Sequence, residues 1–184
     1  MTGSRPPSTR PSRTVVLALG SNLGDRLANL QQGLTLACGD GLACRAVSAV
    51  FQTKAVGGPD QDDFLNAVLL ADSARPARAI LDRCQRAEAA LGRVRTVHWG
   101  PRTLDIDLIT CGTEVSGDAE LTLPHPRAHE RAFVLAPWLD VAPGACLPGH
   151  GLVAGLVAAV GTDGVRRRDD LRLILPAEAD TACR

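Results

Sequence analysis

The 184-residue chain has few aromatic side chains and almost no lysine. It contains no tyrosine, its aromatic residues make up 3% of the chain, and Lys54 is its one lysine. Positive charge therefore comes from arginine, whose planar guanidinium grips carboxylates and phosphates with two parallel hydrogen bonds. The 20 basic residues are balanced by 20 acidic ones, so the net charge is zero. This balance argues against a dedicated nucleic-acid binder, which usually carries a basic excess.

Several sequence signals are also absent. No apolar run approaches the ~20 residues of a membrane-spanning helix, and the N-terminal residues lack the apolar core of a signal peptide. These absences predict a cytoplasmic protein. The six cysteines show no CxxC pair and no metal-finger spacing, so we expect small core residues in a reducing compartment. The pattern GxxxxGK[ST] is missing too, which excludes a P-loop.

Composition divides the chain into three parts. Residues 1–13 are rich in Arg, Ser and Pro and carry no acidic residue, which predicts a disordered tail. We expect a single domain over 14–160, because no interior linker or repeat is visible. Residues 161–184 are charged and form a C-terminal extension, to which the sequence assigns no role.

Hydrophobic patterns predict alternating strands and helices in the central part. Short apolar runs predict strands over 15–19, 42–53, 64–71 and 104–110. Apolar residues at helical spacing predict helices over 26–38, 76–91 and 151–160. Loops rich in Gly and Pro are expected over 54–62 and 93–103. The order of the first six elements predicts an α+β, ferredoxin-like βαββαβ core, with a mainly antiparallel sheet and helices packed on it.

Two carboxylates alternate with apolar residues in the last of these strands. Because side chains on a strand alternate between its faces, Asp105 and Asp107 point the same way, and Leu104, Ile106 and Leu108 point into the core. Adjacent carboxylates repel each other unless a cation neutralises them. Mg²⁺ suits such hard oxygen ligands and often shares them with substrate phosphates. The alternative is a solvated strand face on which surface arginines pair with both aspartates.

A basic loop leads directly into this strand. Residues 89–104 include no acidic residue but carry Arg93, Arg95, His98 and Arg102. Cations beside metal ligands form a clamp for polyphosphates, since both neutralise the charge on phosphate oxygens. The alternative is a solvated loop that forms salt bridges with the preceding helix.

Three further features have a structural and a functional interpretation. The segment GSNLGDR (20–26) lies between a strand and a helix, as a phosphate loop does, but it lacks lysine and we expect it to be structural. Phe64 and Phe133 are typical core residues, although a flat heteroaromatic substrate fits between two such rings. His125 suits either a turn or a phosphate contact.

Four blocks of the sequence occur in an order that is typical of one enzyme family. They are LALGSNLGDR (17–26), F-x-T with a downstream FLNA (51–67), GPRTLDIDLI (100–109) and LTLPHPRAHERAFVLAP (121–137). Together, over 14–150, they resemble the 6-hydroxymethyl-7,8-dihydropterin pyrophosphokinases of folate biosynthesis. That family transfers pyrophosphate from ATP to the hydroxymethyl group of a reduced pterin and releases AMP. The resemblance implies an ATP-dependent diphosphotransferase with small-molecule substrates, no nucleic-acid or membrane partner, and a monomeric state.

The resemblance also implies roles for charged residues. Asp105 and Asp107 match the ligands of two Mg²⁺ ions, which can clamp the attacking and leaving oxygens of an in-line displacement at the β-phosphorus. Arg93 and Arg102 match the catalytic arginines. Residues that match ATP contacts are Gln85, Glu88, Arg95, His98, Trp99, Leu108, Thr122, His125 and Arg131.

A second group matches the pterin pocket of the family. Phe64 and Phe133 would stack on the two faces of the ring, and the amide of Asn66 would read its hydrogen-bonding edge. The whole matching set is Thr53, Lys54, Val56, Phe64, Asn66 and Phe133. Many family members carry tyrosine in place of Phe64 and arginine in place of His98, which implies a missing hydroxyl contact and pH-sensitive ATP binding near neutrality.

Two other functions compete with this interpretation. A degenerate homologue would bind pterin or nucleotide without catalysis, but both aspartates and both catalytic arginines are present. An RNA-binding ferredoxin-like module is disfavoured by the zero net charge and by the lack of paired aromatics on a strand.

Overall fold

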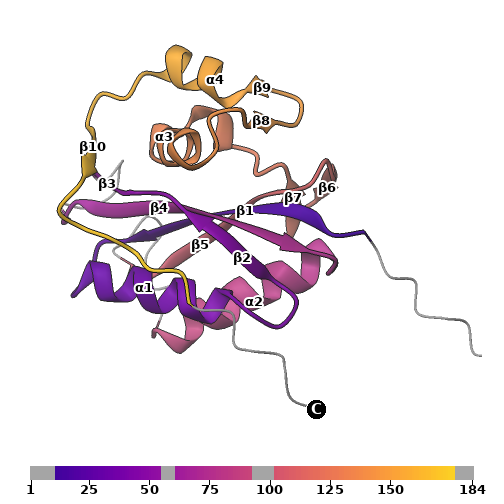
Figure 1. Ribbon diagram of the computed structural model, residues 1–184, viewed down its shortest axis with the longest axis horizontal. Helices are drawn as coiled ribbons and strands as arrows, with labels where there is room; N and C mark the ends of the chain where they lie inside the picture. The colour runs from indigo at the N-terminus through magenta and orange to yellow at the C-terminus, as the bar shows by residue number, and fades with distance from the viewer. Residues whose placement is uncertain (1–10, 55–60, 93–101, 177–184) are drawn as a thin grey trace, which may run out of the picture.

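The computed structural model of the chain describes residues 11–54, 61–92 and 102–176. The predicted tail lies outside these ranges apart from its last three residues. In the described part, six strands form an antiparallel sheet in the order β10-β3-β4-β1-β5, with β2 also paired to β4 (Figure 1). These strands are β1 (Arg13–Ser21), β2 (Ala43–Val47), β3 (Val50–Thr53), β4 (Phe64–Ser73), β5 (Asp105–Cys111) and β10 (Val165–Arg168).

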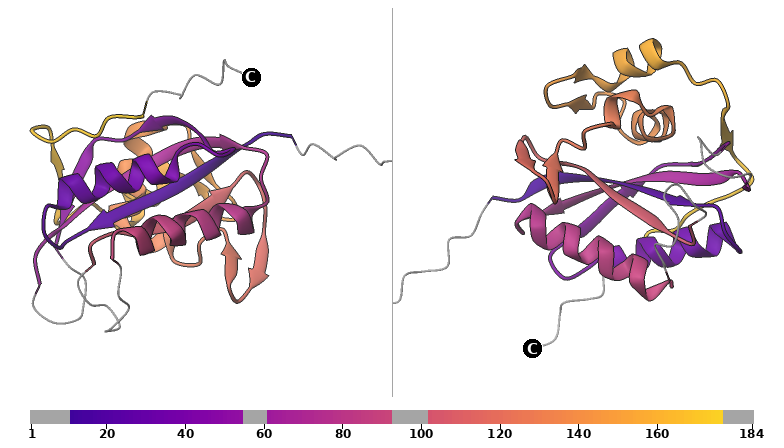
Figure 2. Two further views of the ribbon diagram at one scale, coloured as in Figure 1. Left: turned by 90° about the horizontal axis from the view of Figure 1, so that it is seen from below. Right: turned by 180° about the vertical axis from the view of Figure 1, so that it is seen from behind.

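Helices cover both faces of this sheet. One face carries α1 (Arg26–Ala37) and α2 (Ala77–Ala90), and the other carries α3 (Ala132–Val141), on which α4 (Val153–Val160) packs (Figure 2). The smaller elements are the hairpins β6 (Ser116–Asp118) with β7 (Leu121–Leu123) and β8 (Cys146–Leu147) with β9 (Gly151–Leu152), and the 3₁₀ turn η1 (Ala128–Glu130). The predicted ferredoxin-like α+β architecture is confirmed. No helix in the described ranges combines the length and apolar character that crossing a bilayer needs.

The continuous apolar run of β1 explains why this strand is buried on both faces of the sheet. In β1, Val15, Leu17 and Leu19 pack into the core under α1 and α2, whereas Val16 packs into the core under α3. Burial on both faces requires a continuous apolar run, which is what the sequence shows at this strand. β1 therefore runs through the middle of the sheet, between β4 and β5.

The prediction of one strand over 42–53 is wrong, because β2 and β3 are separated at Ser48 and Ala49. Ser48 donates its N–H to the Val68 carbonyl (2.9 Å), and its hydroxyl accepts the Val68 N–H (2.9 Å). The Ala49 N–H donates to the Asp140 carboxylate of α3 (2.9 Å). At the break, the Ser48 hydroxyl and the Asp140 carboxylate therefore accept backbone N–H groups in place of carbonyls of a neighbouring strand. Both β2 and β3 still pair with β4.

One prediction near the C-terminus also needs correction. The helix predicted over 151–160 starts at Val153, because residues 151–152 form β9. The segment after residue 160 forms β10 at the edge of the main sheet, beside β3. Beyond β10 the chain crosses to α1, where Leu173 is buried and Ile174 exchanges hydrogen bonds of 2.7 and 2.9 Å with the Gln31 amide.

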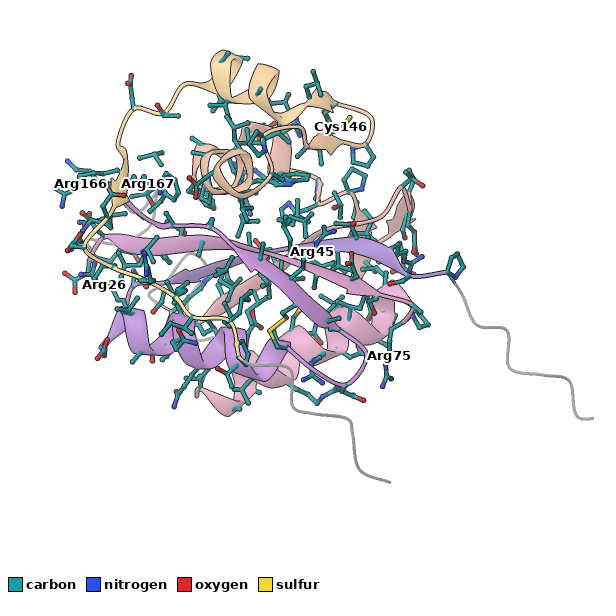
Figure 3. The ribbon with its side chains drawn as sticks, viewed as in Figure 1. Arg26, Arg45, Arg75, Cys146, Arg166 and Arg167 are labelled. Atoms are coloured by element: carbon teal, nitrogen blue, oxygen red, sulfur yellow. A yellow bond between two sulfur atoms is a disulfide. The ribbon has the colours of Figure 1, made fainter. Side chains whose placement is uncertain are left out.

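The prediction that the cysteines are small core residues holds for Cys84 and Cys111, which are buried. It is wrong for Cys146, which is exposed on β8, and for Cys38 and Cys44, which form a disulfide between the end of α1 and β2 (Figure 3). The turn between Cys38 and Cys44 brings their Cα atoms to 5.5 Å. The sixth cysteine lies outside the described residues.

Candidate functional site

The ends of four strands meet at one edge of the sheet. Because β1 is antiparallel to both its neighbours, Gly20 near its end lies opposite Asn66 of β4 on one side and Asp105 of β5 on the other. Thr53, at the end of β3, lies opposite Phe64 of β4. This topology brings together residues from distant parts of the sequence.

A cavity of about 810 Å³ opens at this edge, a volume typical of small-molecule sites. Its walls include Gly20, the η1 region, and Val160, Gly161 and Asp163 from the α4–β10 connection. The predicted site residues that line it are Thr53, Lys54, Phe64, Asn66, Arg102, Asp105, Asp107, His125, Arg131 and Phe133.

Other predicted site residues are not part of this lining. Leu108 is buried in the apolar core, and the Thr122 hydroxyl donates to the Asp118 carbonyl of the β6–β7 hairpin (2.9 Å). Gln85 is exposed on α2, and the buried Glu88 carboxylate accepts the Ile106 N–H (2.7 Å). The predictions for Val56, Arg93, Arg95, His98 and Trp99 fall outside the described residues.

Asp105 and Asp107 line the cavity from one face of β5, and Ile106 between them is buried in the core. The Arg102 guanidinium donates to Oδ2 of Asp105. Arg131 Nη1 donates to Oδ2 of Asp107 at 3.1 Å. Both aspartates therefore pair with arginines, as the alternative interpretation of the sequence expects. They nevertheless line a cavity rather than a solvated strand face. The two guanidiniums lie where they can bind a second anion beside the carboxylates.

His125 is a further ionisable side chain beside Asp107. Its Nε2 lies 3.7 Å from Oδ2 of Asp107, and its Nδ1 accepts the Arg127 N–H at 3.2 Å. That contact leaves the ring proton of a neutral imidazole on Nε2, which faces the cavity. Burial lowers the pKa of His125 below its ordinary value, against the opposing effect of Asp107. The ring is therefore a neutral hydrogen-bond donor at pH 7.

The pKa of Asp107 shifts in the opposite direction. Burial raises it above its usual range and the neighbouring Asp105 raises it further, while His125, Arg131 and Arg102 oppose this rise. The ionised carboxylate is thus less favourable in the folded protein than in the unfolded chain. A bound cation would remove this disadvantage.

We expect Asp107→Asn to raise the melting temperature at pH 7. The variant keeps the shape of the side chain and removes the unfavourable charge. The gain should fade as the pH falls through the raised pKa, because the wild-type carboxyl is then protonated in the folded state. Calorimetry from pH 4 to pH 8 measures it. An unchanged or lower melting temperature at pH 7 would mean that the Arg131 ion pair outweighs burial.

The carboxylate pair fits a divalent cation shared with a ligand. In the described ranges, no three or more His, Cys, Asp or Glu side chains gather into a complete metal cage. Mg²⁺ does not require one, because it keeps several waters and commonly takes one or two carboxylates together with substrate phosphates. Asp105 and Asp107 are such a donor set.

A neutral region of the same cavity adjoins the charged one. Asn66 is buried on β4, and its Nδ2 donates to the Thr53 hydroxyl at 2.9 Å. This contact fixes the amide with Oδ1 toward Gly20. The rings of Phe64 and Phe133 line the cavity, and the Arg131 guanidinium lies over the Phe133 ring, 5.5 Å from its centre.

Gly20 and Asn22 belong to the segment 20–26, which was expected to be structural. A Cβ at Gly20 would lie 3.2 Å from Oδ1 of Asn66 and 3.7 Å from Cδ1 of Phe64. Because Gly20 has no side chain, the side chains of Asn66 and Phe64 have room beside it. No local pattern signals this requirement, since it depends on the pairing of β1 with β4.

Comparisons with known proteins all identify the same family. The sequence model of the 7,8-dihydro-6-hydroxymethylpterin-pyrophosphokinase family matches residues 16–143. The 2-amino-4-hydroxy-6-hydroxymethyldihydropteridine pyrophosphokinase of Mycobacterium tuberculosis is 44% identical over 173 residues, which cover 89% of this chain and 90% of that protein. The protein of the same name from Bacillus subtilis is 42% identical over 127 residues, covering 68% and 75% of the two chains.

A solved structure has the same fold at low sequence identity. The crystal structure of a Plasmodium falciparum HPPK-DHPS variant with pteroate matches with a TM-score of 0.68 and 10% identity. The match covers 87% of this chain and 47% of that one, so the chain spans about half the length of this neighbour.

Proposed function

The chain belongs to the 7,8-dihydro-6-hydroxymethylpterin-pyrophosphokinase family, and we propose that its cavity is where pyrophosphate passes from ATP to the pterin. The protein is a pyrophosphokinase that acts on hydroxymethyldihydropterin in folate biosynthesis, with ATP as co-substrate. The observation that carries the assignment of the site is the division of one cavity into a charged and a neutral part. One part suits polyphosphate and the other suits a heteroaromatic ring.

The charged part is proposed to bind the polyphosphate of ATP. Asp105 and Asp107 would hold two Mg²⁺ ions, which supply charge neutralisation and align the phosphates when bound. Arg102 and Arg131 lie next to these carboxylates and would move onto phosphate oxygens, where their planar forks bind two oxygens at once. His125, neutral and protonated on Nε2, would donate one further hydrogen bond.

The reaction itself requires little covalent chemistry from the protein. The hydroxymethyl oxygen loses its proton and forms a bond to the β-phosphorus, and the bond from that phosphorus to the oxygen that bridges it to the α-phosphorus breaks, so that AMP leaves with this oxygen. Such transfers depend on alignment and on neutralising charge at the moving group. We propose that Arg102, together with Arg93, supplies that neutralisation. The further ATP contacts predicted for Gln85, Glu88, Leu108, Thr122, Arg95, His98 and Trp99 stay predictions.

The neutral part is proposed to bind the pterin. The Thr53 hydroxyl orients the Asn66 amide, so the edge of the ring would meet a fixed pair of donor and acceptor. Phe64 and Phe133 would pack against the ring, for which Arg131 has to leave the face of Phe133 that it covers. Lys54 and Val56 complete the predicted pterin set.

We expect Gly20→Ala to raise the KM for the pterin about tenfold and to leave the affinity for ATP within a factor of two. The added methyl group crowds Oδ1 of Asn66, and misaligning one polar contact costs about 1.4 kcal/mol, which is tenfold in affinity. Steady-state kinetics with each substrate varied in turn measure the effect. Gly117→Ala on β6 is the control, because its Cβ would meet nothing within 4 Å. An unchanged pterin KM would contradict the placement of the ring beside Asn66.

The proposed function is tested by mixing purified protein, ATP, Mg²⁺ and 6-hydroxymethyl-7,8-dihydropterin and following the products by mass. AMP and the pterin diphosphate should form together and require the metal. ADP as product would contradict pyrophosphoryl transfer. Saturable binding of ATP or pterin without product would favour the degenerate homologue instead.

The cellular setting of the enzyme is also a proposal. The monomeric state stays a prediction. The need for ATP supports the cytoplasm as its location. We propose 14–160 as the catalytic domain, to which 161–176 adds β10 and part of the cavity wall.

A further inference from the structure

Asn22 links two segments of the site that are distant in sequence. It follows β1 directly and is 1% exposed. Its backbone N–H donates to the Arg102 carbonyl at 3.1 Å, and its Oδ1 accepts the Arg102 N–H at 2.7 Å. These two bonds hold the backbone of Arg102, whose guanidinium extends to Asp105.

The amide nitrogen of the same side chain binds the segment before β4. Nδ2 of Asn22 donates to Oε1 of Gln61 at 2.8 Å and to the Asp62 carbonyl at 3.3 Å. Phe64, which lines the neutral part of the cavity, follows two residues later. One buried amide therefore joins the backbone that carries the phosphate-side arginine to the backbone that carries the pterin-side ring.

The chemistry of these contacts is specific to asparagine. The site uses one side-chain acceptor for Arg102 and two side-chain donors for the 61–62 segment. A carboxylate supplies the acceptor without the donors, and serine is too short to reach both partners. The neighbouring residue Asp63 is held separately: Arg26 on α1 donates to its carbonyl at 2.6 Å, and Gln52 on β3 donates to its carboxylate at 2.7 Å.

We propose that Asn22 is a positioning residue that keeps Arg102 and the segment 61–63 in the relative placement required for transfer. This inference rests on the proposed function of the cavity. In-line displacement is sensitive to alignment, and a misplacement of ~1 Å costs about 100-fold in rate. Asn22 touches neither reacting group, so its effect runs through Arg102 and through the chain that leads to Phe64.

The test compares Asn22→Ala with Asn22→Asp. Asn22→Ala removes the side-chain bonds to Arg102, Gln61 and Asp62, leaves the backbone bond to the Arg102 carbonyl, and should lower kcat by about 10- to 100-fold. Asn22→Asp keeps the acceptor for Arg102, so it should restore most of kcat. It should still raise the KM for the pterin, because it lacks the donors to Gln61 and Asp62. The Kd for ATP should change less than threefold in both variants.

Hydrogen exchange followed by mass spectrometry gives a readout that does not depend on activity. The Arg102 amide should exchange faster in Asn22→Ala than in wild type and stay protected in Asn22→Asp. Asn29→Ala is the matched control. Its amide donates to the Leu23 carbonyl (2.8 Å) and the Ser21 hydroxyl (3.4 Å) in the same turn. It should lower stability without changing kcat or exchange at Arg102.

Two results would overturn the inference. One is an equal loss of kcat in Asn22→Ala and Asn29→Ala that follows their melting temperatures, which would make Asn22 a purely structural residue. The other is unchanged exchange at Arg102 in Asn22→Ala. Wild-type protein that forms no AMP or pterin diphosphate would overturn the proposed function instead, and the exchange experiment would still test the link.

Discussion

Asp107→Ala is expected to lower turnover at least 1,000-fold at saturating substrates. The variant removes one of the two carboxylates that would hold Mg²⁺, and metal ions contribute several kcal/mol to phosphoryl transfer, of which ~4 kcal/mol corresponds to a thousandfold in rate. Asp105 would remain as the single carboxylate donor on this face of β5, which weakens the hold on the metal. Arg131 also loses the anion beside it and would repel a metal ion at this site.

The effect is measured as the rate of AMP formation over a range of Mg²⁺ concentrations. The Mg²⁺ requirement of Asp107→Ala should rise along with the loss of turnover, and the variant should remain folded by circular dichroism. Asp82→Ala is the matched control, since its carboxylate pairs with Arg78 on the exposed side of α2 and does not line the cavity. Turnover near the wild-type rate in Asp107→Ala would contradict the proposed metal site.

Arg102→Ala should lower kcat by about 100- to 1,000-fold, the usual cost of losing one donor that stabilises developing charge. Arg102 lies beside Asp105 at the phosphate side of the cavity. Its backbone is held by Asn22, and these backbone contacts survive the substitution. The loss therefore reports on the guanidinium alone.

Arg102→Lys separates charge from shape. Lysine keeps a positive charge but lacks the planar fork, so it should recover only part of the lost rate. Pre-steady-state quench experiments with both substrates bound measure the transfer step directly. Arg78→Ala, which removes an exposed arginine of α2, should leave the rate unchanged. A wild-type rate in Arg102→Ala would remove Arg102 from the catalytic set.

Several features of the fold follow from local sequence patterns. The alternation around Asp105 and Asp107 predicted which side chains face the core, and the burial of Leu104, Ile106 and Leu108 agrees. The helical spacing also predicted the extents of α1 and α2. Such patterns are readable because burial repeats with the period of a strand or a helix.

Other features lacked a local signal. The break between β2 and β3 depends on Asp140, which lies about 90 residues further along the chain and caps Ala49 from α3. The β10 strand is charged and has no apolar period, so its place beside β3 comes from pairing alone. The disulfide between Cys38 and Cys44 depends on the turn that joins α1 to β2.

By itself, the sequence determined the fold class and the chemical types present at the site, because periodicity and motif spacing are properties of neighbouring residues. Its four blocks also carry the resemblance to the family. The tertiary structure alone decided how these groups meet. Antiparallel pairing of β1 with both β4 and β5 places Gly20 against Asn66 and allows Asn22 to bind Arg102 and Gln61. These contacts join residues up to 80 positions apart, and their geometry is set by strand register rather than by any local pattern.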